Sequence, residues 1–532
     1  MSLLSASNLA FRYPSQADPV FQEISFVVNP GDRIALVGPN GSGKTTLLRI
    51  LAGEFDPHAG AVVRRQQLRV SYVPQGSHSF VEERVEDYVL TANPVLWKLH
   101  REIRALESRL QDVEGASHYA DLLNAFEEQG GFRFHAEAKK VLEGLGFSPQ
   151  ERALPMAHNS SGQRARAELA RLLLAPADLL LIDEPTDRLD IAAREWLEEY
   201  LARVHAAYLV VSHDRVFLSR VASRIFELRR HALAVYNGNF EFYLEQRAIR
   251  EKQARDDYAA QQRRVVAANQ ASDRRMVLSR RVAKAPRGVR NGSDFYARKA
   301  AKVARTARIL RERVARGTVA DKPWKDEPLP LLEFPNVNRS SGVVLRVERL
   351  SKAYGNKRLF HNLSFDVQAG THWAILGPNG CGKSTLLRVL LGYENADHGT
   401  VVRSARVRPG YYAQEGDNLE AHLSPVELCL QVHANETWVR TILGCLRLRG
   451  EDAERPVQSM CAGERCKVAL ARLLLSGADL LLLDELTNHL DIEAREAVEQ
   501  TLRSFPGTIL FVSHDRYFIK MLADEVLDFS AR

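Results

Sequence analysis

Two glycine-rich segments with the same pattern contain the residue types that hold phosphate groups. Gly38-Pro-Asn-Gly-Ser-Gly-Lys-Thr45 recurs as Gly377-Pro-Asn-Gly-Cys-Gly-Lys-Ser384, each between an apolar run and an apolar helical pattern. In this context the glycines let backbone N–H groups face a phosphate, the lysine reaches the outer phosphates, and the last hydroxyl contacts Mg²⁺. The predicted nucleotide contacts come from Gly38, Asn40, Gly41, Gly43, Lys44, Thr45, Thr46, Gly377, Asn379, Gly380, Gly382, Lys383, Ser384 and Thr385.

Paired acids at the ends of two leucine-rich runs could complete a hydrolytic site. The runs over residues 179–182 and 480–483 are typical of strands buried on both faces of a parallel sheet. The first acid of each pair, Asp183 or Asp484, is expected to contact Mg²⁺. The second, Glu184 or Glu485, is placed where a carboxylate can polarise an attacking water.

A histidine follows a further apolar strand in each copy of this pattern. His213 and His514 both stand in a Ser-His-Asp-Arg context. The less specific interpretation is that the acids only cap strands, the glycines only form turns and the histidines only pack. Because all three features occur twice in the same order, the pattern favours nucleotide hydrolysis.

The spacing of the motifs reveals an internal repeat with an insertion. The two glycine-rich lysines are 339 residues apart, whereas the later motifs are 301 apart, so the first copy carries 38 extra residues. Register holds as far as Gln75 and returns at Gly162, which places the insertion between them. A 4, 3, 4 spacing of apolar residues there predicts an amphipathic helix, formed by Leu99, Ile103, Leu106 and Leu110. Both a helical arm with a binding partner and a larger helical subdomain without one remain open.

The charge of the chain is concentrated in one segment. The net charge is +7, but residues 247–316 hold 21 Lys or Arg against 6 Asp or Glu, a local +15, so the remainder carries −8. Such a segment in an otherwise acidic protein indicates a polyanionic partner. There is no apolar run of the roughly 20 residues that a membrane-spanning helix needs and no secretory-signal pattern, so a cytoplasmic protein with five reduced cysteines is expected.

The basic segment predicts two antiparallel helices with a cationic bend. A 4, 3, 4, 3, 4 apolar stripe marks the second helix, at Tyr296, Ala300, Val303, Ala307, Leu310 and Val314. The first helix is expected from about Tyr243 towards Ser279. Pro286 and two glycines interrupt helix between them, so five cations are expected at the tip, where they could contact RNA phosphates: Arg280, Arg281, Lys284, Arg287 and Arg290. The alternative is an ordinary solvated charge run.

Taken together, the motifs resemble those of ABC ATPases, and the tandem arrangement resembles the ABC-F family over nearly the whole chain. The resemblance implies an α/β fold: two P-loop nucleotide-binding domains, each a mixed sheet with a helical subdomain, joined by a basic helical hairpin. The corresponding boundaries are residues 1–242, with an arm at about 90–146, then 243–325 and 326–532. It also implies ATP and Mg²⁺ as cofactors, with Gln75 and Gln414 at the nucleotide and metal sites and the two histidines beside the γ phosphate.

The family's signature loop is degenerate in both copies. Asn159-Ser-Ser-Gly-Gln163 keeps Ser160 and Gly162, whereas Met460-Cys-Ala-Gly-Glu464 has Cys461 in place of serine and keeps Gly463. In the family the two cassettes close head to tail within one chain, so Lys44 would share its nucleotide with Cys461, Gly463 and Glu464, and Lys383 with Ser160, Gly162 and Gln163. Because a thiol donates a weaker hydrogen bond than a hydroxyl, the Lys44 site is expected to hydrolyse ATP more slowly.

Two tyrosines and three substitutions complete the comparison with the family. The resemblance assigns adenine stacking to Tyr13 and Tyr354, against the alternative of plain surface packing. Asp187 and Arg188 replace the family's Asn-His pair, which Asn488 and His489 retain, and Leu486 stands where proline is usual. These changes keep the carboxylates but alter the contacts of the following loop.

The resemblance implies a ribosomal partner reached through the linker. Family members enter the tRNA exit region of the ribosome and act as translation factors or as antibiotic-resistance proteins, so rRNA is the expected partner, with tRNA as a second candidate. A monomer with intramolecular cassette pairing is expected. One rival is the ATPase subunit of an ABC exporter, which leaves the basic linker unexplained. The other is a DNA-associated ABC ATPase, whose hairpin would lie inside a cassette rather than between two.

Overall fold

The chain divides into two compact units. A computed structural model describes residues 2–14, 18–73, 82–107, 113–282, 293–316, 334, 342–355, 357–413, 419–488 and 490–529. Unit 1 consists of Met1–Phe240 together with Leu329–Arg532, and unit 2 is Glu241–Pro328. Unit 1 contains both copies of the repeat, which are called the first copy (residues 1–240) and the second copy (residues 329–532).

The first copy is built on a six-stranded sheet with the order β5-β6-β7-β3-β8-β9. All neighbours are parallel except β8 and β9, which form an antiparallel hairpin. The central strands are continuous runs of Leu, Ile and Val because helices cover both faces of a parallel sheet. The bounds are β3 Arg33–Val37, β5 Val70–Tyr72, β6 Leu179–Asp183, β7 Ala207–Val211, β8 Arg224–Arg229 and β9 Ala232–Asn237.

A second, antiparallel sheet packs against this one in the first copy. Its strand order is β2-β1-β4, and the alternating burial of β2 shows one face towards the core and one towards solvent. A shared apolar core joins the two sheets and α1. The bounds are β1 Leu4–Phe11, β2 Phe21–Val28, β4 Ala59–Arg64, α1 Lys44–Ala52, α7 Ser161–Leu174, α8 Ile191–Arg203 and α9 Arg215–Val221.

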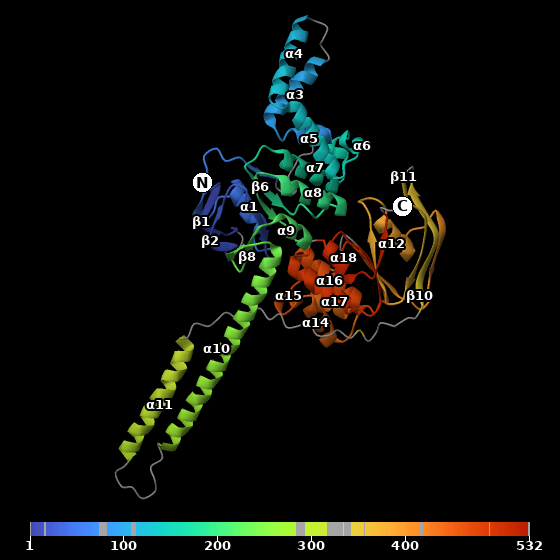
Figure 1. The fold of residues 1–532 in the computed structure, drawn as a ribbon. Coiled ribbons are helices and arrows are strands. Elements are labelled where there is room, and N and C mark those ends of the chain that lie inside the picture. The colour runs from blue at the N-terminus through green and yellow to red at the C-terminus, as the bar shows by residue number, and fades with distance from the viewer. Residues whose placement is uncertain are drawn as a thin grey trace. The chain divides into compact units, whose positions relative to one another are not determined.

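The remaining helices of the first copy form a helical subdomain that contains the insertion. They are α2 Val85–Leu90, α3 Pro94–Glu107, α4 Val113–Glu128, α5 Gly131–Gly144 and α6 Pro149–Arg152. The extra residues are α3 and α4, which form a paired projection beyond α5 (Figure 1). The predicted helix is confirmed over α3, where Ile103 packs with Leu96 and Phe126; Leu110 lies outside the described residues.

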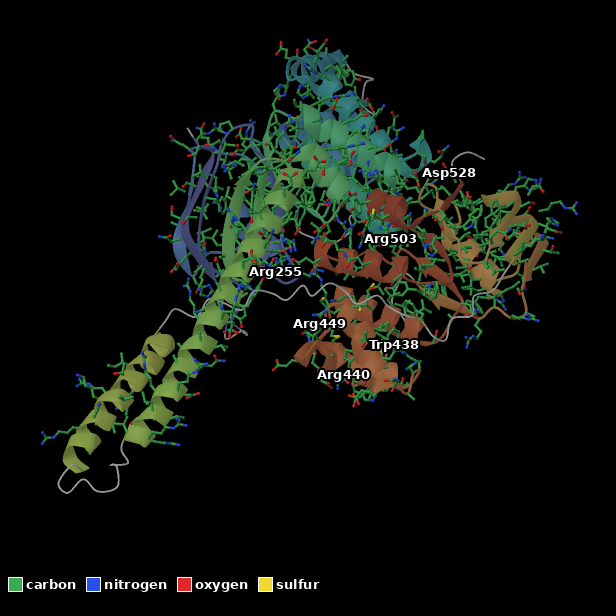
Figure 2. The ribbon with its side chains drawn as sticks, turned by 60° about the horizontal axis from the view of Figure 1, so that its bottom comes forward. Arg255, Trp438, Arg440, Arg449, Arg503 and Asp528 are labelled. Atoms are coloured by element: carbon green, nitrogen blue, oxygen red, sulfur yellow. The ribbon has the colours of Figure 1, made fainter. Side chains whose placement is uncertain are left out.

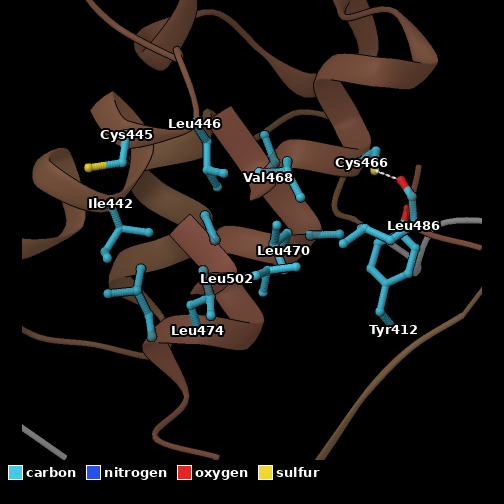
Figure 3. Close-up of a cluster of buried hydrophobic side chains, with 14 of the residues drawn as sticks. Tyr412, Ile442, Cys445, Leu446, Cys466, Val468, Leu470, Leu474, Leu486 and Leu502 are labelled. Atoms are coloured by element: carbon cyan, nitrogen blue, oxygen red, sulfur yellow. Dashed lines mark hydrogen bonds between the residues drawn. The ribbon is translucent and has the colours of Figure 1, made fainter. Parts of the chain in front are cut away.

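The second copy repeats this architecture without the insertion. Its sheets have the orders β14-β15-β16-β12-β17 and β11-β10-β13. Its helical subdomain packs on the main sheet through the apolar cluster of Figure 3, where the buried Cys466 thiol donates to the Leu486 carbonyl at 3.4 Å. The strand bounds are β10 Val343–Tyr354, β11 Lys357–Gln368, β12 His372–Leu376, β13 His398–Arg403, β14 Pro409–Tyr412, β15 Leu480–Asp484, β16 Thr508–Val512 and β17 Glu525–Asp528. The helices are α12 Lys383–Leu391, α13 Pro425–Leu430, α14 Glu436–Cys445, α15 Glu451–Glu454, α16 Ala462–Leu475, α17 Ile492–Arg503 and α18 Arg516–Leu522.

Unit 2 is a helical hairpin. The helices are α10 Phe240–Val282 and α11 Ser293–Arg316, and the Ser279 hydroxyl donates to the Ala300 carbonyl at 2.9 Å between them. Every Lys and Arg whose side chain is described from Arg263 to Arg308 is exposed. Nearer the start of α10, the side chain of Arg255 also projects from the helix (Figure 2). The two predicted helices are confirmed. Lys284, Arg287 and Arg290 lie outside the described residues, and α11 contains the predicted apolar stripe, of which only the Ala300 and Val303 side chains are described.

No helix in the described part of the chain has the combination of length and apolar character that crossing a bilayer requires.

Candidate active sites

The first glycine-rich loop joins β3 to α1 and depends on glycine at two positions. A Cβ atom on Gly38 would lie 2.2 Å from the carbonyl oxygen of Leu228. Gly43 has a φ of 96° and a Cβ there would lie 2.3 Å from Cγ1 of Val20. Any other residue would therefore force the loop away from the sheet, and the start of α1 could no longer approach a phosphate closely.

The lysine of each loop is buried and bonded to the loop itself. Lys44 Nζ donates to the carbonyls of Gly38 and Pro39 at 2.8 and 3.0 Å. Lys383 makes the equivalent bonds at the same distances. Burial lowers the pKa of Lys44, and the nearby acids, Glu184 first, oppose that shift. Each ammonium group is thus held at the loop, where phosphate oxygens could replace the carbonyls as acceptors.

The first acid of each pair has the properties of a cation ligand. Both carboxylate oxygens of Asp183 and Oδ1 of Asp484 are buried without a hydrogen-bond partner among the described residues. Burial raises the pKa of both carboxyls, and the adjacent hydroxyls, Thr45 and Ser384, lower it by less. Buried oxygens without a donor are costly unless a cation occupies the space. Mg²⁺, which prefers carboxylate and hydroxyl oxygen ligands, fits these two positions.

The second acid of each pair sits in a strained backbone conformation. Glu184 and Glu485 have φ values of 46° and 50°, in the left-handed region that residues with a Cβ rarely adopt. In both copies the backbone N–H of the glutamate donates to the neighbouring strand at 3.0 Å. Such strain persists where the surroundings enforce it and is concentrated at functional sites. Here the strained residue directly follows the last residue of β6 or β15.

The two glutamates have different neighbours three residues later. Asn488 Nδ2 donates to Glu485 Oε2 at 2.6 Å, so an amide stabilises that carboxylate. The first copy has Asp187 at this position, which cannot donate when ionised. Burial, followed by the negative charge of Asp187, raises the pKa of Glu184 well above its usual value. A smaller fraction of Glu184 is therefore ionised than its ordinary pKa would give, and only the ionised form can accept a proton.

The histidines lie beside the glutamates and are neutral. His213 Nε2 is 3.2 Å from Glu184 Oε1, and His514 Nε2 is 3.8 Å from Glu485 Oε1. Burial lowers the pKa of His213 well below its usual value and that of His514 to about 3. A neutral imidazole can donate one hydrogen bond to a phosphate oxygen without adding charge.

Each site is also contacted by the other copy of the repeat. Asp491, which caps α17, accepts from the backbone N–H of Asn40 at 3.0 Å. Asp190, which caps α8, accepts from the N–H of Asn379 at 3.3 Å. The first residues of one copy's helix thus touch the phosphate loop of the other, in both directions. This reciprocal contact is the head-to-tail arrangement that the resemblance implied.

Two turns further along, α8 and α17 make ion pairs across the same boundary. Arg215 Nη2 is 2.8 Å from Glu499 Oε1, and Arg516 pairs in the equivalent way with Glu198. The Arg215 guanidinium also lies 4.3 Å from the Tyr517 ring centroid. Burial raises the pKa of Glu499 to about 7, against the opposing effect of Arg215.

The signature loops begin two further helices. Ser160 caps α7, where its hydroxyl accepts from Gln163 N–H at 3.2 Å while its own N–H donates to Gln163 Oε1 at 2.9 Å. In the second copy the Cys461 N–H donates to Glu464 Oε2 at 2.9 Å, and Arg455 pairs with Glu464. Serine and cysteine thus occupy equivalent exposed helix starts. The sharing of nucleotides between these loops and the opposite lysines stays a prediction.

The two tyrosines are held differently. The Tyr13 hydroxyl bonds with the Thr46 hydroxyl at 2.8 Å, and the Tyr13 ring packs edge-on against Phe11 at 5.1 Å. Tyr354 donates to Glu394, and Lys352 Nζ lies 5.3 Å from its ring centroid. The Tyr354 side chain is 51% exposed, so its ring is accessible to a base. Adenine stacking on either ring stays a prediction.

Sequence reasoning placed the loops, acids and histidines of each site together and expected the two copies to meet, but it missed the residues that make the cross-copy contacts. The signal was present: acid, arginine and glutamate recur at four-residue intervals, one helical turn apart, with the same 301-residue spacing as the motifs. The series is Asp190, Arg194 and Glu198 in the first copy and Asp491, Arg495 and Glu499 in the second. Gln75, Gln414 and His489 lie outside the described residues.

Family models and relatives match this chain over both copies of the repeat and over part of the linker. A family model described as ABC transporter matches residues 21–187 and 360–488, and a related model with the same description matches residues 226–285. The ATP-binding protein YdiF of Bacillus subtilis strain 168 is 34% identical, over 97% of this chain and 78% of its own length. YbiT of Escherichia coli O157:H7, also an ATP-binding protein, is 32% identical over 99% and 96%. ABC transporter F family member 5 of Arabidopsis thaliana is 29% identical over 96% and 72%.

Solved structures share the fold at lower identity. The archaeal ribosome recycling factor aABCE1, solved in complex with the ribosomal stalk protein aP1, matches with a TM-score of 0.63 at 20% identity, over 98% of this chain and 87% of the solved chain. A structure described as RNase-L Inhibitor matches with a TM-score of 0.60 at 20% identity and the same coverage.

Proposed function

Because this chain belongs to the ABC-F family, with two ATP-binding cassettes in one polypeptide, we propose that it binds the ribosome, contacts rRNA through its basic hairpin and acts on translation in the cytoplasm. Protection of ribosomes from antibiotics is one form that this action could take. The observation that carries the proposal is the hairpin of α10 and α11, whose described Lys and Arg side chains from Arg263 to Arg308 are all exposed.

In this proposal, ATP hydrolysis by the two cassettes drives the action on the ribosome. When bound, ATP with Mg²⁺ provides a phosphoanhydride bond whose hydrolysis can drive a change of state. Lys44 and Lys383 would bind its outer phosphates, and Asp183 and Asp484 would hold the cation. Glu184 and Glu485 orient the attacking water and accept its proton. The Asp190 and Asp491 contacts bring the opposite cassette onto each phosphate loop, so nucleotide binding and cassette closure are one event.

The charge of the hairpin favours RNA over other partners. The eleven described cations between Arg263 and Arg308 face a single exposed acid, Asp273, among the described side chains of that stretch. Internal ion pairs therefore cannot neutralise the surface. A dense array of exposed cations binds closely spaced phosphates by releasing their counterions. A solved protein of the same fold is a ribosome recycling factor, so the tandem-cassette fold is compatible with work on ribosomes.

Sedimentation with ribosomes tests the proposal directly. The Glu184→Gln, Glu485→Gln chain should pellet with ribosomes in ATP and stay in the supernatant in ADP, because the variant retains nucleotide in the closed state. If the variant stays in the supernatant with both ATP and ADP, it does not bind ribosomes and the proposal is wrong. Retention by a membrane fraction instead would favour the exporter subunit, and a shift of duplex DNA would favour a DNA-associated ATPase.

Charge reversal tests the role of the hairpin. Arg280→Glu with Arg281→Glu should weaken ribosome binding and make its dependence on log salt shallower by about 0.7–0.9 for each phosphate that the hairpin no longer neutralises. The matched control is Arg403→Glu with Arg406→Glu, which reverses two exposed cations in the second cassette. If both pairs of substitutions change the salt slope equally, or neither does, the hairpin is not the segment that binds RNA.

A further inference from the structure

Two buried arginines connect the histidine loops of the two cassettes. Arg194 lies on α8 and Arg495 on α17, four residues after the aspartates that touch the opposite phosphate loops. Their exposed fractions are 5% and 6%. Burying a guanidinium costs free energy unless its N–H groups donate hydrogen bonds. The acceptors of these bonds therefore identify the segments that the arginine holds together.

Each arginine bonds to its own histidine loop and to the other one. Arg194 Nη1 donates to Asp214 Oδ2 at 3.1 Å, next to His213 in its own cassette. The same atom donates to the backbone carbonyl of His514, in the other cassette, at 2.7 Å. Arg194 therefore bridges the residue after one histidine and the backbone of the other.

The second arginine repeats this bridge in the opposite direction. Arg495 Nη1 donates to Asp515 Oδ2 at 3.0 Å and to the His213 carbonyl at 3.0 Å. The Nε atoms of both arginines donate to the carbonyls of Leu189 and Leu490 at 3.0 Å, which anchors each side chain to the loop that follows its own glutamate. Two parallel links thus join the histidine loops across the cassette boundary.

We propose that Arg194 and Arg495 are positioning residues that couple the two ATP sites, by making the position of each histidine depend on that of the other. A histidine that shifts onto a γ phosphate moves its own carbonyl and the following aspartate. Because the arginine bonds are short and buried, the opposite histidine loop cannot keep its position without breaking one of them. Binding of ATP at one site then favours the binding geometry of the other.

This inference rests on the proposed binding of ATP at both sites, but not on ribosome contact, so it is tested without ribosomes. In the Glu184→Gln, Glu485→Gln background, a fluorescent N-methylanthraniloyl-ATP is titrated into the chain. Lys44→Ala and Lys383→Ala versions give the affinity of each site alone. The coupling factor is the ratio of the two-site binding constant to the product of the single-site constants.

Arg194→Lys with Arg495→Lys is the first test of the link. Lysine keeps the charge but cannot bond two acceptors and a third carbonyl in the fixed geometry of guanidinium. A coupling factor of about five or more, in the range usual for linked sites, should fall to about one while the single-site affinities change little. The control, Arg203→Lys with Arg503→Lys, makes the same substitution at exposed positions of the same two helices and should leave the coupling factor intact.

A second variant breaks the same link from its other end and is expected to fold. Asp214 and Asp515 also cap α9 and α18, a role that asparagine performs equally well. Asp214→Asn with Asp515→Asn removes the charged acceptor of each arginine and should also abolish coupling. The inference is overturned if the parent chain shows a coupling factor of one, if coupling survives both pairs of substitutions, or if the single-site affinities fall together with the coupling factor in both.

Discussion

The acid at position 187 offers the sharpest test of how the two sites differ. Asn488 donates its amide to Glu485 at 2.6 Å, whereas Asp187 places a second negative charge near the buried Glu184. Asp187→Asn would turn this repulsion into a hydrogen bond. Because a general base acts only in its ionised form, the substitution should speed hydrolysis at the Lys44 site.

The size of the effect follows from the contact seen in the second cassette. A hydrogen bond to a charged group stabilises it by about 1.5–3 kcal/mol. The Glu184 side chain is only 13% exposed, so solvent screens little of this. Since about 1.4 kcal/mol is a factor of ten in an equilibrium constant, Asp187→Asn should lower the pKa of Glu184 and favour its ionised form by about tenfold or more. Where Glu184 is mostly protonated, its ionised fraction rises by that factor, and the rate rises by less than that factor because a less basic carboxylate accepts the proton less readily.

Phosphate release measured in a Glu485→Gln background isolates the Lys44 site. Asp187→Asn should raise its rate and move the acid limb of its pH–rate profile to lower pH. Asp187→Ala, which removes the charge without adding a donor, should give an intermediate rate. The reciprocal Asn488→Asp in a Glu184→Gln background should slow the Lys383 site. An unchanged profile in Asp187→Asn would refute the argument, because both charge and hydrogen bond would have been altered without consequence.

Two further predictions concern the sites and the arm. Without any change at position 187, the Glu485→Gln chain, which retains the Lys44 site, should turn over more slowly than Glu184→Gln, and equal residual rates would contradict the inequality. In the arm, burial and then the charge of His100 lower the pKa of His135 to about 4, against 6.5 in an unfolded chain. Between those two pH values only the unfolded state binds this proton, so the free energy of unfolding should fall as the pH drops from about 6.5 towards 4. In thermal unfolding measured across this pH range, His135→Gln should lose less stability than the parent chain. An equal loss in the variant would show that His135 is not its source.

The fold was predictable because its strongest signals are local and repeated. Each glycine-rich loop needs a strand before it and a helix after it, and β3–α1 and β12–α12 have that form. The apolar runs before Asp183 and Asp484 became central parallel strands because a sheet covered on both faces needs such runs. The linker became two helices because Arg, Lys, Ala and Gln favour helix where no proline intervenes.

The contacts between cassettes were not predictable in the same way. The residue type does not indicate the left-handed φ of Glu184, because the sequence has glutamate at a position where glycine would be unstrained. The cross-cassette bonds of Arg194 and Arg495 depend on how two distant helices meet, and a four-residue interval of charges is equally typical of a solvated helix surface. Only the recurrence of that interval in both copies could have separated a contact between cassettes from a solvated surface.

The strained backbone at Glu184 and Glu485 sets the stability of the fold against the catalytic role proposed for these two residues. A glycine at either place would relieve left-handed strain of the order of 1–3 kcal/mol, in a domain whose total margin is commonly about 5–15 kcal/mol. It would also remove the carboxylate that is proposed to activate water. Selection for thermal stability alone would thus favour substitutions at these two glutamates that abolish ATP turnover. A more heat-stable variant that keeps its ATPase activity must therefore be stabilised at other positions.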